Sequence, residues 1–244
     1  MIPKIIHYCW FGRGQKPALA VKCIASWKKY LPDYEIKEWN EDNFDLDLYP
    51  YAREAYDNRK FAFVTDVVRL YALYHEGGIY MDTDVEVLKP LDCFLDLPAF
   101  SGFEDDINVP TGIMASEKGG KWVKENLAYY DRRHFVNHNG ELDLTTNVIS
   151  ITNYMLSHGL KRNNTFQQFA DLITIYPKDY FCPKSYIDGK IYLTNNTYTI
   201  HHFAGSWQTP YRRFVFRVGH FIGYDNLQKL IALKKIVCKM LFIK

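Results

Sequence analysis

The pattern of apolar and polar positions predicts strands that alternate with helices along most of the chain. Apolar or alternating runs bounded by turn residues predict strands, and apolar residues spaced three or four positions apart predict helices. The predicted strands are 4–11, 34–39, 79–88, 99–104, 172–177 and 198–203. The predicted helices are 17–32, one or two within 51–76, 120–133 and 147–159. This order is typical of an α/β fold with a mostly parallel central sheet.

Two carboxylates lie where such a sheet usually binds ligands, at the carboxyl end of a strand. Asp82 and Asp84 end the apolar part of the predicted strand 79–88, which directly follows the pair Gly77-Gly78. Strict alternation along the strand would put both side chains on one face, where both can address one ion. Carboxylate oxygens suit Mg²⁺ or Mn²⁺, which proteins usually hold with one or two carboxylates and substrate phosphates.

An Asp-x-Asp triplet is weak evidence on its own. The chain contains a second one, Asp45-Leu46-Asp47, in a polar stretch that we interpret as a surface turn. From the residues alone, Asp82 and Asp84 are therefore open to two interpretations. They form a metal–phosphate site, or they are two solvated aspartates at the end of a strand.

The preceding helix carries a charged pair in apolar surroundings. Asp66 and Arg69 are three positions apart and share a helix face. Their neighbours are apolar on most sides, which is typical of a buried helix, and buried charges need partners. The pair is either an internal ion pair that stabilises the helix or a polar site in which Arg69 faces phosphate or sugar oxygens and Asp66 accepts from hydroxyls.

Composition narrows the class of protein. The five cysteines show no CxxC spacing, which favours reduced thiols in a cytoplasmic protein over a zinc site or a disulfide scaffold.

The C-terminal tail differs in charge from the rest of the chain. Residues 210–244 contain eight Lys or Arg and one Asp, which gives this tail a charge of +7. Since the net charge of the chain is +2, the rest of the chain has a charge of −5. Residues 225–244 predict a basic amphipathic helix, which either docks on the core or binds an anionic membrane surface. Positive charge confined to the tail argues against nucleic acid.

Three segments carry a resemblance to a known family. FAFVTDVVRLYALYHEGGIYMDTDVEVLKPL at 61–91 resembles the signature of retaining glycosyltransferases with a DXD motif, the group that is classified as glycosyltransferase family 32. Related proteins include yeast-type α-mannosyltransferases, bacterial capsule and O-antigen sugar transferases, and the glucosyltransferase domains of clostridial toxins. IPKIIHYCWFG at 2–12 resembles the first strand of this group, and TIHHFAGSW at 199–207 resembles its final metal-binding segment.

The resemblance implies a GT-A, Rossmann-like nucleotide-binding domain at 1–209, followed by the tail at 210–244. It also implies a nucleotide-sugar donor with Mn²⁺ or Mg²⁺. Asp82, Asp84 and His202 would bind the metal, with His201 as the alternative because adjacent strand residues point to opposite faces. The residues implied on the donor are Trp10 on the base, Asp82 on the ribose, Asp66 and Arg69 on the sugar and its phosphate, and Tyr80, Ser206 and Trp207 around them.

The implied reaction is retaining transfer of a hexose or N-acetylhexosamine, with UDP favoured as the nucleotide. The acceptor would be a glycan, lipid-linked, in bacterial capsular or lipopolysaccharide O-antigen synthesis at the inner face of the plasma membrane. Residues 104–116 either line the acceptor side or form a surface loop, and Thr145-Thr146-Asn147 departs from the family's Thr-Gly-Pro.

Two other classes of function remain open. One is an aspartate-based phosphatase, although that class expects Thr or Val four residues after the first Asp and this chain has Glu86. The other is a non-catalytic glycan-binding module, which only the high aromatic content of 16% favours.

Overall fold

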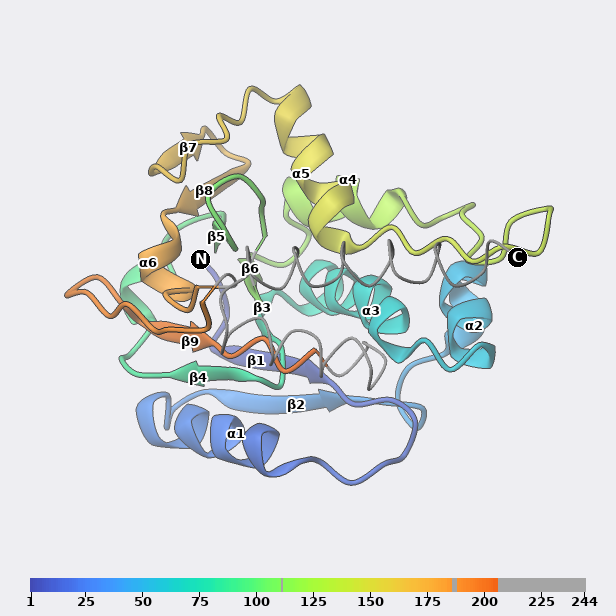
Figure 1. The fold of residues 1–244 in the computed structure, drawn as a ribbon, viewed down its shortest axis with the longest axis horizontal. Helices are drawn as coiled ribbons and strands as arrows, with labels where there is room; N and C mark the ends of the chain where they lie inside the picture. The colour runs from blue at the N-terminus through green and yellow to red at the C-terminus, as the bar shows by residue number, and fades with distance from the viewer. Residues whose placement is uncertain (111, 186–187, 206–244) are drawn as a thin grey trace, which may run out of the picture.

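The computed structural model describes residues 1–110, 112–185 and 188–205, and these confirm the predicted α/β class (Figure 1). The central sheet has seven strands in the order β2-β1-β3-β6-β5-β8-β7. Their bounds are β1 Ile5–Cys9, β2 Glu35–Trp39, β3 Gly78–Met81, β5 Ala99–Gly102, β6 Ile113–Ser116, β7 Gln167–Phe169 and β8 Ile173–Tyr176. A second sheet pairs β4 (Val85–Val87) with β9 (Thr199–His201).

The helices cover both faces of the central sheet. α1 (Ala18–Tyr30) packs with β4 against one face, where Trp27, Ile6 and Ile79 belong to the same buried cluster. The other helices in the described residues are α2 Pro50–Asp57, α3 Phe61–Glu76, α4 Lys121–Ala128, α5 Asn147–Ser157 and α6 Lys178–Phe181. α3 covers the opposite face, and Figure 1 shows α4 and α5 beyond it. Alternation along β3 therefore turns Tyr80 toward α3, while Ile79 and Met81 face the α1 side.

The sheet is less parallel than the alternation of elements predicts. Within the described strands, β1 is parallel to β2 and β3, and β5 is parallel to β8. β6 is antiparallel to both β3 and β5, and β7 is antiparallel to β8. β6 and β7 were not predicted, and β6 lies inside the segment 104–116, for which lining of the acceptor side and a surface loop were both open. The loop itself is therefore limited to the residues between β5 and β6.

The glycine pair makes the turn from α3 into β3. Both residues have positive φ, 73° at Gly77 and 109° at Gly78, a region that side chains other than glycine rarely adopt. A Cβ at Gly78 would lie 2.6 Å from the carbonyl oxygen of Ile5, so the close approach of β1 also requires glycine there. This short turn holds the end of β3 close to the polar residues of α3.

No helix among the described residues is long and apolar enough to cross a membrane. Ser206, Trp207 and the tail at 210–244 lie outside the described residues, so the tail's helix and its membrane contact stay predictions.

Candidate functional site

Asp82 and Asp84 lie in a tight turn rather than on one continuous strand. β3 ends at Met81 and β4 begins at Val85, so the predicted strand 79–88 is broken at the two carboxylates. The Asp82 carbonyl accepts from Val85 N at 2.9 Å, which closes the turn, and Asp82 N donates to Gly112 O at 2.8 Å. The two side chains therefore converge through the turn and not through strand alternation.

His201 completes a cluster with the two aspartates. The antiparallel pairing of β4 with β9 puts His201 opposite Val85, next to Asp84 in the chain. Its Nε2 is 3.5 Å from Asp84 Oδ1 and 4.0 Å from Asp82 Oδ2. One ligand atom from each of the three residues lies within 4.8 Å of the other two. Two carboxylates and one imidazole fit a divalent cation such as Mn²⁺.

His202, the histidine we expected to bind metal, is directed elsewhere. Its Nε2 lies 2.8 Å from Glu86 Oε2, and Glu86 also pairs with Lys22 Nζ at 2.8 Å. Only its backbone contacts the turn, since His202 N donates to the Asp84 carbonyl at 3.0 Å. The structure thus places His201 at the cluster, because side chains at adjacent positions point to opposite sides of the chain.

The charged pair of α3 extends the cluster toward the helix. Arg69 Nη2 lies 3.3 Å from Asp66 Oδ1 and 3.2 Å from Asp82 Oδ1, so one guanidinium bridges the two carboxylates. The same guanidinium stacks over the Tyr80 ring at 4.7 Å, and the Tyr80 hydroxyl donates to Asp82 Oδ1 at 2.8 Å. Asp66, Arg69, Tyr80 and Asp82, four residues implied by the resemblance, therefore form one contiguous network.

Burial and neighbouring charges shift the pKa values of these residues in opposite directions. Burial raises the pKa of Asp66 to about 6, although Arg69 works against this. Burial would also raise the pKa of Asp84, but the facing His201 outweighs it and lowers that pKa to about 2. For His201, burial lowers the pKa, yet the Asp84 carboxylate raises it well above the ordinary value. The site therefore keeps several charged groups in a largely dry environment, as functional sites often do.

The pKa of Asp66 predicts a pH-dependent contribution to stability. Since its pKa is 3.8 in an unperturbed chain and about 6 when buried, the folded protein holds a proton that the unfolded chain has already lost between these values. The contribution is complete below about pH 4 and is lost as the pH rises through 6. We expect the free energy of unfolding of wild type, relative to Asp66→Asn, to fall by about 2.4 kcal/mol between pH 4 and 7. Denaturant titrations at both pH values measure it, and an unchanged difference would contradict the assignment.

Asn147, which sequence reasoning left without a role, contacts Asp66. It is the first residue of α5, and its backbone N donates to Asp66 Oδ2 at 3.1 Å. Its Nδ2 donates to the Asp66 carbonyl at 2.8 Å, while its buried Oδ1 has no hydrogen-bond partner among the described residues. The N-terminus of α5 therefore supports the negative charge of Asp66. No local pattern in the sequence links the start of this helix to Asp66.

Glu104 is a second residue that sequence reasoning did not single out. It follows β5, and its Oε1 lies 3.8 Å from His201 Nδ1. Burial raises the pKa of Glu104 to about 7, and the carboxylates of Asp105 and Asp82 add to the rise. Its only sequence signal was its position in the segment 104–116, for which lining of the acceptor side was one of two interpretations.

The remaining implied donor residues are placed only in part. Trp10 follows β1, is half-buried, and its Nε1 donates to Gly14 O at 2.6 Å. Lys16 Nζ lies 5.6 Å from the centre of its ring. Stacking of Trp10 on a base stays a prediction, and Ser206 and Trp207 lie outside the described residues.

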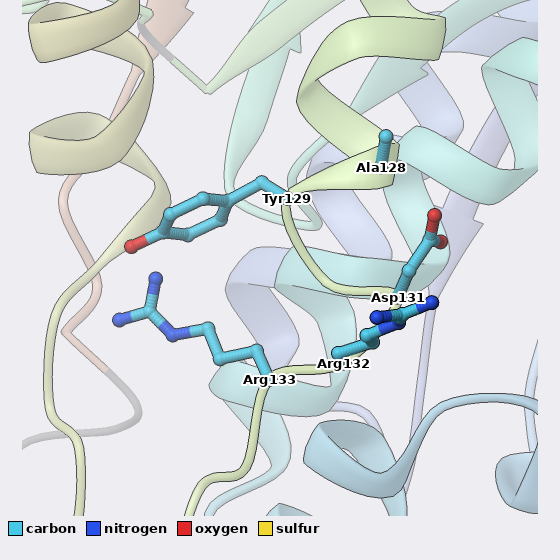
Figure 2. A pocket seen from close by; sticks show the side chains of 5 residues that line it. All are labelled: Ala128, Tyr129, Asp131, Arg132 and Arg133. Carbon is cyan, nitrogen blue, oxygen red and sulfur yellow. The ribbon is translucent and has the colours of Figure 1, made fainter.

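A surface hollow at the end of α4 is a separate feature (Figure 2). Figure 2 shows the Tyr129 ring beside the Arg133 guanidinium, whose carbon lies 4.2 Å from the ring centre. Arg133 also pairs with Asp143. None of the residues that line the hollow belongs to the Asp82–Asp84–His201 cluster, so we do not assign it to the candidate site.

Comparison with known protein families finds a match to part of the chain. The family described as "Glycosyltransferase sugar-binding region containing DXD motif" matches residues 17–102. This range contains Asp66, Arg69, Tyr80 and both aspartates of the turn. It begins after Trp10 and ends before Glu104 and His201. Residues 17–102 are therefore similar to the sugar-binding region of DXD-type glycosyltransferases.

Individual relatives agree with this match. Inositol phosphoceramide mannosyltransferase 3 of Schizosaccharomyces pombe is 31% identical over 141 residues, which cover 56% of this chain and 39% of that protein. Inositol phosphoceramide mannosyltransferase 2 of the same yeast is 35% identical over 124 residues, covering 48% and 34%. The chain thus spans less than two-fifths of these relatives. Among solved structures, the PaToxG glycosyltransferase aligns with a TM-score of 0.49 and 20% identity, covering 66% of this chain and 71% of that one.

Proposed function

We propose that this protein is a metal-dependent glycosyltransferase that moves a sugar from a nucleoside-diphosphate donor to a hydroxyl of a glycan acceptor. The observation that carries the proposal is that Asp82 contacts both a cluster that can bind a metal ion and a buried arginine. On one side Asp82 belongs to a cluster with Asp84 and His201, and on the other it pairs with Arg69 at 3.2 Å. This combination suits a donor whose diphosphate needs both a divalent cation and a fixed guanidinium.

Different residues of the chain would bind the metal ion and the donor phosphate. A divalent cation held by Asp82, Asp84 and His201 would supply Lewis-acid neutralisation of the leaving diphosphate. Arg69, fixed by Asp66 and by stacking on Tyr80, would orient the phosphate and stabilise the charge that grows on it as the sugar–phosphate bond breaks.

The sugar side of the site lies near Asp66. With its Oδ2 held by Asn147 N, Asp66 would accept hydrogen bonds from donor-sugar hydroxyls and fix the ring. In the retaining chemistry that the family resemblance implies, the leaving phosphate takes the proton of the acceptor hydroxyl, so no protein base is assigned.

Donor and acceptor are proposed more narrowly from the resemblance and the relatives. The resemblance of the first strand favours a UDP-hexose or UDP-N-acetylhexosamine, while the names of the yeast relatives support mannose. Those names also specify inositol phosphoceramide, which supports a lipid-linked glycan as acceptor. The basic residues 225–244 add support for a cytoplasmic enzyme at the inner face of the plasma membrane, in surface polysaccharide synthesis.

Nucleotide binding tests the proposal directly. We expect UDP or GDP to stabilise the protein only when Mn²⁺ is present, because the diphosphate and the ion complete one another's coordination. At a ligand concentration about 100 times Kd, the gain is about 2.7 kcal/mol, which corresponds to a rise in Tm of about 5 to 10 °C. Thermal unfolding with each nucleotide, with and without Mn²⁺, measures this.

The same measurement separates the alternatives. Stabilisation by a phosphate analogue but by neither nucleotide would favour the aspartate-based phosphatase. Stabilisation by neither would leave a glycan-binding module. A screen of donor hydrolysis across UDP-glucose, UDP-galactose, their N-acetyl forms and GDP-mannose then identifies the donor.

A further inference from the structure

The ring of His201 is held in a narrow slot. A Cβ on Gly112 would lie 3.1 Å from both Cγ and Cε1 of the imidazole, so the backbone of Gly112 packs directly against one side of the ring. The ring of Phe203 lies against it with a centroid distance of 4.4 Å. Gly112 also accepts the hydrogen bond from Asp82 N, which ties the slot to the carboxylate turn. The orientation of the imidazole is therefore set before any ligand binds.

The two ring nitrogens of His201 face different groups. Nε2 faces the carboxylates of Asp84 and Asp82, whereas Nδ1 lies 3.8 Å from Glu104 Oε1. Nδ1 is buried and has no hydrogen-bond partner among the described residues, although the Cys182 side chain also approaches the ring. Buried ring nitrogens usually have a partner, and a carboxylate is the strongest acceptor for an imidazole N–H.

Hydrogen bonds hold the backbone around Glu104 in place. Its backbone N donates to Asn108 O at 2.9 Å, and Asp105 Oδ1 accepts from Ile107 N and Asn108 N. Further along the loop, the backbone of Val109 exchanges two hydrogen bonds with Thr152 Oγ1 on α5. A carboxylate on such a support can hold a fixed position beside the histidine.

We propose that Glu104 is the positioning residue of the metal site. Its carboxylate accepts a hydrogen bond from His201 Nδ1–H and thereby keeps the Nε2 lone pair directed at the space between Asp82 and Asp84. The 3.8 Å separation is too long for a hydrogen bond and shortens when a cation draws on Nε2. Histidines that bind metals commonly donate their other N–H to a carboxylate in this way. The inference rests on the proposed function, since it assigns a role within the same metal site.

Substitution of Glu104 should change the affinity of the site for Mn²⁺. In the full chain we expect Glu104→Ala to weaken Mn²⁺ binding by about 10- to 100-fold, measured from the electron paramagnetic resonance signal of free Mn²⁺. Glu104→Gln keeps an acceptor oxygen and should recover part of the loss. Asp106→Asn is the matched control, because it removes one negative charge from the same loop at an exposed residue that pairs with Lys178. It should bind Mn²⁺ as wild type does.

A second measurement separates orientation from charge. Long-range ¹H–¹⁵N correlation spectra of the Zn²⁺-loaded protein report which ring nitrogen of His201 carries the proton. Because an ion on Nε2 leaves only Nδ1 to carry the proton, we expect the Nδ1–H form in all three proteins, with its proton shifted furthest downfield by the carboxylate in wild type, less in Glu104→Gln and least in Glu104→Ala. These spectra also show whether each variant is folded. Unchanged Mn²⁺ affinity in Glu104→Ala, or a Gln variant no better than the Ala variant, would overturn the role of Glu104.

Asp84→Ala distinguishes failure of this inference from failure of the metal site. If Asp84→Ala abolishes Mn²⁺ binding and Glu104→Ala does not change it, the metal site stands and only the inference fails. If wild type itself does not bind Mn²⁺, the proposed metal-dependent function fails and the role of Glu104 fails with it.

Discussion

Asp84→Asn should lower metal-dependent transfer of the donor sugar by about 10³-fold or more. The substitution keeps the size of the side chain but removes the charge that lies closest to His201 Nε2, at 3.5 Å. Loss of a well-held divalent cation removes several kcal/mol of stabilisation from the charge on the leaving group, and about 4 kcal/mol corresponds to a factor of about 10³. Steady-state rates across a Mn²⁺ titration, with nucleotide-dependent thermal stabilisation as a second readout, measure the effect.

The chain provides its own control in the other Asp-x-Asp triplet. Asp47 is 72% exposed at the side chain and pairs with Arg53 on the surface. Asp47→Asn removes the same charge from the same short motif at a place with no link to His201, and it should leave turnover and Mn²⁺ dependence unchanged. Full activity of Asp84→Asn at the Mn²⁺ concentration that suits wild type would show that the cluster does not serve the reaction.

The part of the site that could be predicted from sequence is local along the chain. Apolar periodicity identified the buried helix α3, and a spacing of three put Asp66 and Arg69 on one of its faces. The glycine pair indicated a short turn, which brings α3 and the end of β3 together. The contact between Arg69 and Asp82 follows from these local features, because 13 residues containing one tight turn leave the two side chains few ways to be far apart.

The part that could not be predicted depends on pairing between distant segments. His201 meets Asp84 only because β9 pairs with β4 in the register that puts His201 opposite Val85. Alternation indicates that one of two adjacent histidines faces the site, but the register, which no local pattern contains, decides which one. Glu104 depends on long-range packing in the same way.

The sheet shows the same division between local and distant information. Hydrophobic runs located most strands of the sheet, including β1, β3, β5 and β8. They could not reveal direction, and the insertion of β6 between β3 and β5, antiparallel to both, makes the centre of the sheet mixed. β6 has four residues, as β5 and β8 do, but it follows a polar stretch and was not recognised as a strand.

Arg69→Met should destabilise the fold and abolish transfer. The Arg69 side chain is 11% exposed, and its guanidinium lies within 3.3 Å of both Asp66 and Asp82. Its removal leaves two carboxylates in a largely buried place without this counter-charge. Breaking a buried ion pair from one side costs about 3–5 kcal/mol, and we expect a loss of that size in the free energy of unfolding at pH 7. Denaturant titration measures it.

The loss should be smaller in acid. The pKa of Asp66 is already raised to about 6 by burial, and without Arg69 it rises further. A carboxyl group with a raised pKa in the folded state is most favourable below its unfolded value and loses that advantage as the pH rises through the folded value. Arg69→Met should therefore approach wild-type stability near pH 4 and diverge from it toward pH 7. A loss that is equal at both pH values would mean that packing, and not the carboxylates, dominates.

Two further variants separate charge from geometry. Arg69→Lys keeps the positive charge and should recover much of the stability at pH 7, yet it should remain poorly active because an ammonium group cannot reproduce the planar fork that spans two partners. Arg133→Met is the matched control, since Arg133 also pairs with a carboxylate, Asp143, and stacks on a tyrosine, but away from the cluster. It should lose some stability and keep its transfer activity. If Arg69→Lys transfers sugar as well as wild type, Arg69 acts only as a counter-charge for Asp66 and Asp82 and does not orient the donor phosphate.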